Sequence, residues 1–588
     1  MEQNGDFADA CRRAFAPEHG RRWKTAAAEA LAIGRTTLYR YLNGEVPVPG
    51  DVRARLAAIT HQPANPYARA YAGTLPGEDR MTPEQHIAGA ARPFTGKEYI
   101  DSLKDGREVY INGERVKDVT THPAFRNSVR SLARLYDALH TDRADGKGVL
   151  TTDTDTGSGG FTHRYFRVAR APAELKAQQV AIAEWARLTY GWMGRTPDYK
   201  AALMNTLGAN AEYYGQFVGN ARAWYKRAQD NVLFMNHAIV NPPVDRGRPT
   251  SEVKDVYVTI DKETDAGVIV SGAKVVATSA ALTHYNFLGQ NAATATSDPD
   301  MAIMFILPMD APGVKLICRN SYEEIATRMG TPFDYPLSSR FDENDAIFVL
   351  DKVLIPWENI LVHRDTDKIL SFYPRSGFLN GFCFQGCTRY AVKLDFICGL
   401  VAKALRATGG DEFRGNQAML GEIVAWRDLF WSLSDGMASN PQPWVGDALL
   451  PNLQPAIAYR VFAPDAYSRI KEIIEKIVAS ALIFLPSSAR DFQNPAIDPL
   501  LERYVRGSNG IGYKERIKIM KLLWDAIGTE FGGRHELYER NYAGNHEDIR
   551  IQALTGARRN GNMDRMIGLV DRCMSEYDET GWVDEHWA

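Results

Sequence analysis

The sequence lacks long apolar runs, and its cysteines are few. No stretch approaches the roughly 18 consecutive apolar residues of a membrane-spanning helix, so we expect no contact with a membrane. Six cysteines among 588 residues do not form the dense pattern of a disulfide-stabilised secreted domain. The N-terminal sequence MEQNGDFADACRRAF also lacks the basic segment followed by an apolar stretch that marks a secretory signal. Together these absences predict a cytoplasmic protein.

Common nucleotide-binding motifs are absent as well. The one dense glycine cluster, at residues 157–160, does not read GxGxxG, and the chain holds no P-loop. The charge is nearly balanced, with 69 Lys and Arg against 72 Asp and Glu, and 45% of the residues are hydrophobic. This composition is typical of folded domains and excludes a disordered chain. At roughly 150 residues per domain, the length predicts three or four domains.

Residues 1–80 differ from the rest of the chain in charge and pattern. Between Arg12 and Arg55 there are nine basic residues and four acidic ones, a net of +5. Apolar spacing predicts two short helices that resemble the helix-turn-helix of phage-type repressors, although Ala32 stands where that family has glycine. The expected outward face of the second helix is made of Thr36, Thr37, Tyr39 and Arg40. A linker rich in proline and glycine follows, so these residues form a separable module that either contacts DNA or is a small helical appendage with a basic face.

Beyond residue 90 the hydrophobic period changes twice. Apolar residues spaced 4, 3, 4 and 3 apart over residues 125–139 predict an amphipathic helix, and another follows at 173–190. Over residues 256–361 short β-branched segments alternate with glycine and proline, as in an antiparallel barrel or sandwich. The helical period then returns. The pattern predicts an α+β multi-domain fold, with a helical domain at 91–235, a central antiparallel β-domain at 236–365 and a C-terminal helical bundle at 366–588.

Two segments hold residues suited to a catalytic site. In GWMGRTPDYK, Pro197 fits the first turn of a helix, with Thr196 as its cap. Arg195 and Tyr199 would then point into one cavity, where a permanent cation beside a phenol suits an anionic or phenolic ligand. The alternative is a helix cap with an ordinary salt bridge. His237, among apolar residues in FMNHAIVNPPVDR, is either a hydrogen-bonded core residue or part of a catalytic cavity.

From about residue 90 to the C-terminus, the chain closely resembles the oxygenase components of the 4-hydroxyphenylacetate 3-monooxygenase family. The likeness rests on long blocks of unusual composition. They include TDTGSGGFTHRYFRVA, EWARLTYGWMGRTPDYKAA, NHAIVNPPVDR, DYPLSSRFDENDAI and KLLWDAIGTEFGGRHELYERNYAGN. Residues 1–80 lie outside the resemblance.

The resemblance implies a fold and a chemistry. The family has the acyl-CoA dehydrogenase fold, whose helical, β and helical domains match the order expected above. Its members take reduced FAD from a separate NAD(P)H-dependent flavin reductase and react it with O2 to form a C4a-hydroperoxide. One oxygen atom then enters a para-substituted phenol ortho to its hydroxyl, giving a catechol. The family also implies a homodimer or homotetramer, in which a neighbouring subunit completes the cofactor site.

The matching motifs carry the family's site residues onto this chain. Arg195, Tyr199 and His237 correspond to the residues that contact the phenol, and His237 would also reach the flavin peroxide. The expected FAD contacts are Thr278 near the isoalloxazine ring, Asn241, Arg246, and Asn541 and Tyr542 from a late segment of a neighbouring subunit. In that segment Gly532 and Gly533 would either allow close backbone approach to the cofactor or form a tight turn at a helix end.

One loop departs from the family pattern. In the family, the segment that corresponds to residues 289–298 is a mobile lid over the substrate, and a Ser or Thr pair in it binds the substrate carboxylate. The aligned positions here are Ala292 and Ala293, with Thr294 and Thr296 close by. Alanine cannot donate a hydrogen bond, so either the threonines replace the pair or the substrate is another phenol. Candidates are a 4-hydroxycinnamate, a tyrosine-type compound and a chlorophenol.

Two other functions are alternatives. 4-Hydroxybutyryl-CoA dehydratase belongs to the same superfamily and holds an iron–sulfur cluster with three cysteines and one histidine. Cys383 and Cys387 have a CxxxC spacing, but no cysteine lies between residues 12 and 317, which favours buried free thiols. A DNA-binding regulator would explain residues 1–80 but not the rest of the chain.

Overall fold

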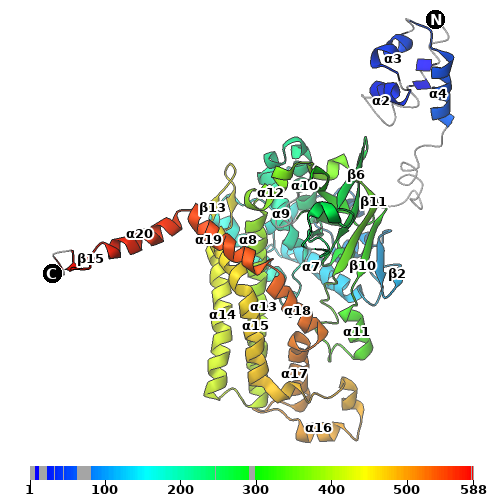
Figure 1. The fold of residues 1–588 in the computed structure, drawn as a ribbon. Coiled ribbons are helices and arrows are strands. Elements are labelled where there is room, and N and C mark those ends of the chain that lie inside the picture. The colour runs from blue at the N-terminus through cyan, green and yellow to red at the C-terminus, as the bar shows by residue number, and fades with distance from the viewer. Residues whose placement is uncertain are drawn as a thin grey trace.

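The computed structural model describes residues 7–8, 10–11, 23–31, 33–43, 46–61, 81–245, 247–290, 298–583 and 586. From residue 81 onward, helices come first, then two β-sheets, then long helices (Figure 1). This order agrees with the sequence of hydrophobic periods. None of the helices in these ranges combines the length and the apolar character needed to cross a membrane.

Three short helices form within residues 23–61. They are α2 (Trp23–Ala30), α3 (Arg35–Leu42) and α4 (Gly50–His61). Their apolar side chains pack into a hydrophobic cluster of their own, which includes Leu31 and Leu38. The four residues expected on the outward face of α3, Thr36, Thr37, Tyr39 and Arg40, are exposed. Ala32, at the predicted joint, lies outside the described residues.

The helices of the first helical part share one core, and α9 is buried on nearly all sides. Its main helices are α6 (Gly96–Ser102), α7 (Arg126–Ala144), α8 (Pro172–Arg187), α9 (Pro197–Ala209) and α10 (Val218–Asn231). The predicted amphipathic helix is confirmed as α7, whose Leu132, Tyr136 and Leu139 are buried because they share one face. Both α8 and α9 begin with proline in the first turn, where the helix needs no N–H donor.

A six-stranded sheet has the order β2-β1-β10-β11-β7-β6. Its strands are β1 (Glu108–Ile111), β2 (Glu114–Val116), β6 (Thr259–Thr264), β7 (Gly267–Lys274), β10 (Val314–Cys318) and β11 (Ala346–Pro356), and α11 (Tyr322–Met329) connects the last two. The strands β1 and β2 come from the segment expected to be helical, and β1 pairs with β10 in parallel. The expected antiparallel β-domain is therefore a mixed sheet. A parallel pair needs a long crossover, so local periodicity could not reveal it.

A second sheet has four strands in the order β12-β9-β8-β5. They are β5 (Met235–Ala238), β8 (Tyr285–Leu288), β9 (Ile303–Pro308) and β12 (Ile360–His363). Strands β5 and β8 pair in parallel and set His237 beside Phe287. The segment KVVATS (residues 274–279) lies in the range predicted to form strands, but β7 ends at Lys274. Val276 and Ser279 have positive φ values of 57° and 60°, which interrupt a strand.

Long helices form the C-terminal part. They are α12 (Thr366–Arg375), α13 (Phe378–Thr408), α14 (Arg414–Ser439), α15 (Leu453–Val478), α16 (Asp498–Tyr504), α17 (Tyr513–Ile527) and α18 (Glu530–Asn541). Helices α13, α14 and α15 lie side by side, and α18 packs against α15 and α17 (Figure 1). Helix α9 packs against α13, which thereby links the bundle to the first helical part. Helix α19 (His546–Arg559) packs against α15, and α20 (Asn562–Met574) continues away from the bundle (Figure 1).

Removing residues 1–80 should leave the rest of the chain folded. The hydrophobic cluster of α2, α3 and α4 shares no residue with the main core. We expect a chain that begins at Met81 to unfold thermally within about 2 °C of the full-length chain, as followed by circular dichroism. A fall of about 10 °C, or aggregation during purification, would show that the main core needs the module.

Candidate functional site

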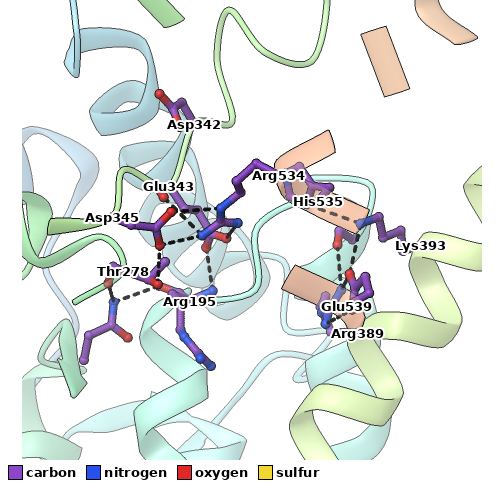
Figure 2. Close-up of polar contacts among 12 residues, drawn as sticks. Arg195, Thr278, Asp342, Glu343, Asp345, Arg389, Lys393, Arg534, His535 and Glu539 are labelled. Atoms are coloured by element: carbon purple, nitrogen blue, oxygen red, sulfur yellow. Dashed lines mark hydrogen bonds and ion pairs between the residues drawn. The ribbon is translucent and has the colours of Figure 1, made fainter. Parts of the chain in front are cut away.

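Arg195 lies on the loop that leads into α9, and aromatic rings surround its guanidinium. The distances from its Cζ to the ring centres are 4.0 Å for Tyr199, 4.8 Å for Tyr542 and 5.4 Å for Tyr538. Its backbone N–H donates a hydrogen bond to the carboxylate of Glu343 (Figure 2). Burial alone would lower its pKa, but the tyrosines and Glu343 raise it, so Arg195 stays a cation.

The start of α9 brings Arg195 and Tyr199 together. Pro197 occupies the first turn and Thr196 the N-cap position, as predicted. The Thr196 hydroxyl does not cap the helix, because it donates to the carboxylate of Asp198 instead. Among the described residues Arg195 forms no ion pair, and its Nη1 is buried without a hydrogen-bond partner. Within this part of the chain the alternative of an ordinary salt bridge is therefore wrong.

His237, on β5, contacts two residues of α9. Its Nδ1 lies 2.8 Å from Nζ of Lys200 and 3.4 Å from the hydroxyl oxygen of Tyr199. Burial lowers the pKa of His237 well below its usual value, and Lys200 and Arg195 lower it further, so the imidazole is neutral near pH 7. Burial raises the pKa of Tyr199 against the effect of Arg195, so the phenol keeps its proton. The structure thus brings Arg195, Tyr199 and His237 to one place.

Two glycines leave the space that tyrosines of α18 occupy. A Cβ on Gly194 would overlap the hydroxyl of Tyr538, and a Cβ on Gly386 would lie 2.6 Å from the hydroxyl oxygen of Tyr542. A side chain at either position would therefore displace a ring that stacks on Arg195. Tyr542 reaches Arg195 of its own chain, whereas the family resemblance assigns this late segment to a neighbouring subunit.

A network of partly buried charges joins the loop before β11 to α18 (Figure 2). Arg534, on α18, forms an ion pair with Asp345 at 2.8 Å, and Arg319 forms another at 3.0 Å. The hydroxyl of Thr278 donates to the same carboxylate at 2.6 Å. Burial would raise the pKa of Asp345, but Arg534 and Arg319 hold it below its usual range. Thr278, expected near a flavin ring, is therefore fixed to α18 through Asp345.

A second buried cluster, which we call the α13–α18 clamp, consists of Arg389 and Lys393 on α13 and Glu539 on α18 (Figure 2). Glu539 accepts hydrogen bonds from Arg389 and, at 2.9 Å, from Lys393, and all three side chains are at most 1% exposed. Burial opposes the charge of Glu539, yet the two cations lower its pKa to about 2. Burial lowers the pKa of Lys393 to about 8 although Glu539 opposes this. The clamp holds the tyrosines of α18 against Arg195.

Several buried polar atoms near Arg195 have no hydrogen-bond partner among the described residues. They are Nη1 of Arg195, Oε2 of Glu343 and the hydroxyl of Tyr538. Burial raises the pKa of Glu343, although Arg534 and Arg195 oppose this. A buried polar group without a partner costs about 1–3 kcal/mol. Donors and an acceptor left open at one place therefore indicate a site for a polar ligand.

Other expected cofactor residues have different surroundings. Asn541 is exposed, and its amide donates to the carbonyl of Leu537 at 2.8 Å. Asn241 is buried and accepts a hydrogen bond from Lys274 at 2.7 Å. Residues that lie outside the described ranges are Arg246, Ala292, Ala293, Thr294 and Thr296.

Gly532 and Gly533 are helical residues in the first turn of α18, so neither forms a non-helical turn at the end of a helix. The N–H of Gly532 donates to the hydroxyl of Thr529, the N-cap residue. A Cβ on Gly532 would lie 2.7 Å from the backbone carbon of Ile527, whereas one on Gly533 would meet nothing within 4 Å. Close packing against α17 therefore explains Gly532.

The cysteines of α13 do not form a metal site. Cys383 and Cys387 are buried free thiols, and burial raises the pKa of Cys383 to about 12. Throughout the part of the chain that the structure describes, no group of three or more His, Cys, Asp or Glu is placed to hold a metal ion. The dehydratase alternative thus gains no support.

Sequence reasoning missed Lys200, Glu343 and Tyr538. Lys200 directly follows Tyr199, and the other two lie in blocks that carry the family resemblance. Nothing local marks them, because each becomes part of the site only through packing between distant segments. The signal that marks Lys200 and Glu343 is their full burial, which is rare for Lys and Glu and is visible only in the structure.

Loss of the negative charge in the α13–α18 clamp should destabilise the fold. Glu539→Gln leaves Arg389 and Lys393 buried without a carboxylate, so we expect the free energy of unfolding to fall by about 3–5 kcal/mol in urea titrations. The control is Glu536→Gln, on the same helix as Glu539. It removes a partly exposed ion pair with Lys471 of α15 and should cost at most about 1 kcal/mol.

The effect of Glu539→Gln should also depend on pH. The carboxylate stabilises the fold fully above its unfolded pKa of about 4.3, and this contribution is lost as the pH falls to the folded value of about 2. The difference between wild type and variant should therefore shrink over that window. A constant difference down to about pH 2 would contradict the charged clamp.

Comparison with known proteins identifies the family. Residues 95–362 match the sequence profile of the 4-hydroxyphenylacetate 3-hydroxylase N terminal, and residues 369–571 match that of the C terminal. The 4-hydroxyphenylacetate 3-monooxygenase oxygenase component of Pseudomonas aeruginosa is 60% identical over 507 residues, which cover 86% of this chain and 97% of that protein. The 4-nitrophenol 2-monooxygenase oxygenase component of a Rhodococcus species is 56% identical, over 84% of this chain and 95% of that protein.

Solved structures agree with this assignment. The crystal structure of an oxygenase component of 4-hydroxyphenylacetate 3-monooxygenase, complexed with FAD and 4-hydroxyphenylacetate, matches with a TM-score of 0.76 and 31% identity, over 82% of this chain and 99% of that chain. The α+β fold seen here is thus the fold of those structures. This chain belongs to the 4-hydroxyphenylacetate 3-hydroxylase family, a family of enzymes that serve as the oxygenase components of monooxygenases.

Proposed function

We propose that this chain is the oxygenase component of a two-component flavin-dependent monooxygenase. It uses reduced FAD and O2 to hydroxylate a para-substituted phenol, such as 4-hydroxyphenylacetate, ortho to its hydroxyl, giving a catechol. A separate NAD(P)H-dependent flavin reductase supplies the reduced FAD through transient contact. The observation that carries the proposal is the meeting of Arg195, Tyr199 and His237, which come from two separate segments of the chain.

The residues at this site fit a flavin bound beside a phenol. The atoms of Arg195, Glu343 and Tyr538 that have no hydrogen-bond partner among the described residues offer donors and an acceptor, which suit the alternating carbonyl and N–H groups of a flavin ring. Oε2 of Glu343 also lies 3.8 Å from Nη1 of Arg534. When bound, reduced FAD supplies the two electrons with which O2 is activated for transfer of one oxygen atom. We assign Thr278 and Tyr542 to the surroundings of the ring. The other proposed contacts are Asn241, Arg246 and Asn541.

The charges at the site favour a phenol that loses its proton. Arg195 stays a cation and attracts a phenolate-like oxygen. Tyr199 keeps its proton and donates a hydrogen bond that orients the substrate. His237 is neutral and accepts the phenol proton at the nitrogen that Lys200 does not contact. Proton loss increases electron density at the ortho carbon, and hydroxylation needs that density.

The choice of phenol depends on the loop at residues 289–298, which we propose to be a lid over the substrate. Relatives in this family are named for 4-hydroxyphenylacetate and for 4-nitrophenol, so members differ in substrate. An alanine pair, Ala292 and Ala293, stands where a carboxylate contact is expected. We assign the carboxylate to Thr294 and Thr296. A phenol without a carboxylate, such as a chlorophenol, is the second candidate.

The finer architecture is part of the same proposal. The three parts at residues 91–235, 236–365 and 366–588 correspond to the domains of an acyl-CoA dehydrogenase-like fold. A homodimer or homotetramer is supported by the apolar side chains that α20 exposes. Those at least 50% exposed include Met566, Ile567, Leu569 and Val570. The cytoplasmic location stays a prediction.

The activity is tested with a flavin reductase, NADH, FAD and a panel of para-substituted phenols. At least one phenol should be converted to its catechol, measured by chromatography. Arg195→Met and His237→Ala should each lower the catechol formed per NADH by about tenfold or more, with hydrogen peroxide formed instead. Arg222→Met, which removes an exposed ion pair with Glu212, is the matched control and should keep the wild-type yield.

The results separate the activity from the site. If no phenol is consumed above the peroxide background, the monooxygenase function is wrong. If a phenol is converted and both variants keep the wild-type yield, Arg195 and His237 do not belong to the site.

We also propose that residues 1–80 form a helix-turn-helix-like module that contacts DNA. Support comes from the exposed face of α3, which includes Tyr39 and Arg40, and from the family match, which begins only at residue 95. The full-length chain should retard a DNA duplex in a gel, less so as salt rises, and Arg40→Ala should weaken the effect. A chain that begins at Met81 should not retard the duplex. Equal retardation by both chains would contradict a DNA contact by the module.

A further inference from the structure

Lys200 is a fully buried lysine that contacts the histidine of the site. It directly follows Tyr199 on α9 and is 0% exposed. Its Nζ lies 2.8 Å from Nδ1 of His237, 4.3 Å from the ring centre of Phe378 and 5.6 Å from that of Phe287. Among the described residues, no carboxylate lies close enough to Nζ of Lys200 (4.0 Å or less) to form an ion pair with it. Lys200 is thus surrounded by rings and has one polar neighbour at short distance.

The surroundings of Lys200 favour a neutral amine. Burial lowers its pKa well below the usual value, and the charge of Arg195 lowers it further. Lys200 and His237 lie too close to carry a proton each, because no counterion offsets two adjacent positive charges. The other titratable groups around the pair and Tyr199 are Arg195, Asp198, Tyr373 on α12, Cys383 on α13 and Tyr542 directly after α18. The one carboxylate among them, Asp198, accepts from Thr196.

The hydrogen bonds of His237 leave one ring nitrogen open. Both partners found among the described residues face Nδ1, and Tyr199 at 3.4 Å is the weaker of the two. A neutral amine has a lone pair, so Lys200 accepts a hydrogen bond from Nδ1–H. The ring then has its own lone pair on Nε2, which is the form needed to accept a proton from a ligand.

We propose that Lys200 is the final acceptor of the phenolic proton of the substrate, reached through the ring of His237. This rests on the proposed function, because it takes a phenol as the ligand of His237. The phenol O–H bond breaks, its proton bonds to Nε2, and the oxygen keeps the electron pair as a phenolate. The Nδ1–H bond breaks, and that proton bonds to the lone pair of Lys200, giving an ammonium. No electron is transferred, and the summed charge of the three groups is unchanged.

The relay suits a site from which water is excluded. The proton stays within the protein, so no water is needed to carry it away. The positive charge comes to rest 2.8 Å from a neutral imidazole, where it favours the phenolate together with Arg195. Lys200 acts through His237 and does not touch the substrate, so it is a positioning residue for the proton.

The relay is tested by counting protons when a phenol binds. Full-length protein with reduced FAD, kept free of oxygen, is titrated with 4-nitrophenol about one pH unit below the pKa of the free probe. Absorbance reports how much of the bound probe is phenolate. Calorimetry in two buffers of different ionisation enthalpy reports the number of protons released. In the wild type we expect bound phenolate with nearly no proton released, because Lys200 retains it.

Two variants separate the relay from simple electrostatics. Lys200→Met keeps the length of the side chain but has no base, so the ratio of bound phenolate to bound phenol should fall about tenfold or more. Lys200→Arg keeps a positive charge but cannot accept a proton. It should bind the phenolate and release close to one proton per site. Circular dichroism confirms that each variant is folded.

The wild-type result is decisive even if a variant does not fold. Release of one proton per bound phenolate, or binding of the probe as a neutral phenol, overturns the relay and leaves the proposed function intact. If the wild type does not bind phenols at all, both the relay and the proposed function are wrong.

Discussion

Opposite charges buried between distant segments hold the site in place. Glu539 on α18 binds Arg389 and Lys393 on α13, which lie 150 and 146 residues away in the sequence. Arg534, on the same helix, binds Asp345 in the loop before β11. Each pair costs free energy to remove from water, and a single partner left buried alone costs more. The position of α18 therefore depends on two regions that are distant from it in the sequence.

The basic side chains at the candidate site have different partners from the basic side chains that hold α18 in place. Arg389 and Arg534 have carboxylate partners, whereas Arg195 is stacked on tyrosine rings and keeps a buried N–H without a partner. Lys200 has aromatic rings and one imidazole around it. A buried cation with no carboxylate is stable only when rings, neutralisation or a ligand compensate for lost water. This contrast marks the place where the fold is adapted to bind an anionic or ionising group.

The sequence predicted those features that local chemistry determines. Proline and threonine placed the start of α9 correctly, and a single apolar face gave α7. Other features depend on contacts across the chain. The parallel pair of β1 and β10 joins segments about two hundred residues apart, and KVVATS fails as a strand because its backbone turns to positive φ at Val276. Gly194 and Gly386 are ordinary glycines until α18 brings a tyrosine against each of them.

The candidate site residues were predicted through motif resemblance, and their protonation states required the structure. Arg195 and Tyr199 are four residues apart, so helix geometry predicted their contact. The sequence did not reveal the protonation state of His237, which burial and the charge of Arg195 keep neutral. Lys200 could not be recognised from its sequence position, because a lysine next to a tyrosine on a helix is most often exposed.

In the proposed function, ring chemistry and substrate choice depend on different parts of this fold. Of the residues proposed to contact the phenol oxygen, Tyr199 lies on α9 and His237 on β5, which are packed against α13 and β8 in the main core. The loop at residues 289–298 follows β8 and lies between that strand and β9. In the proposed function this loop binds the far end of the phenol, so a substitution in it would leave α9 and β5 unchanged. An alanine pair there is therefore compatible with the same hydroxylation of a different phenol.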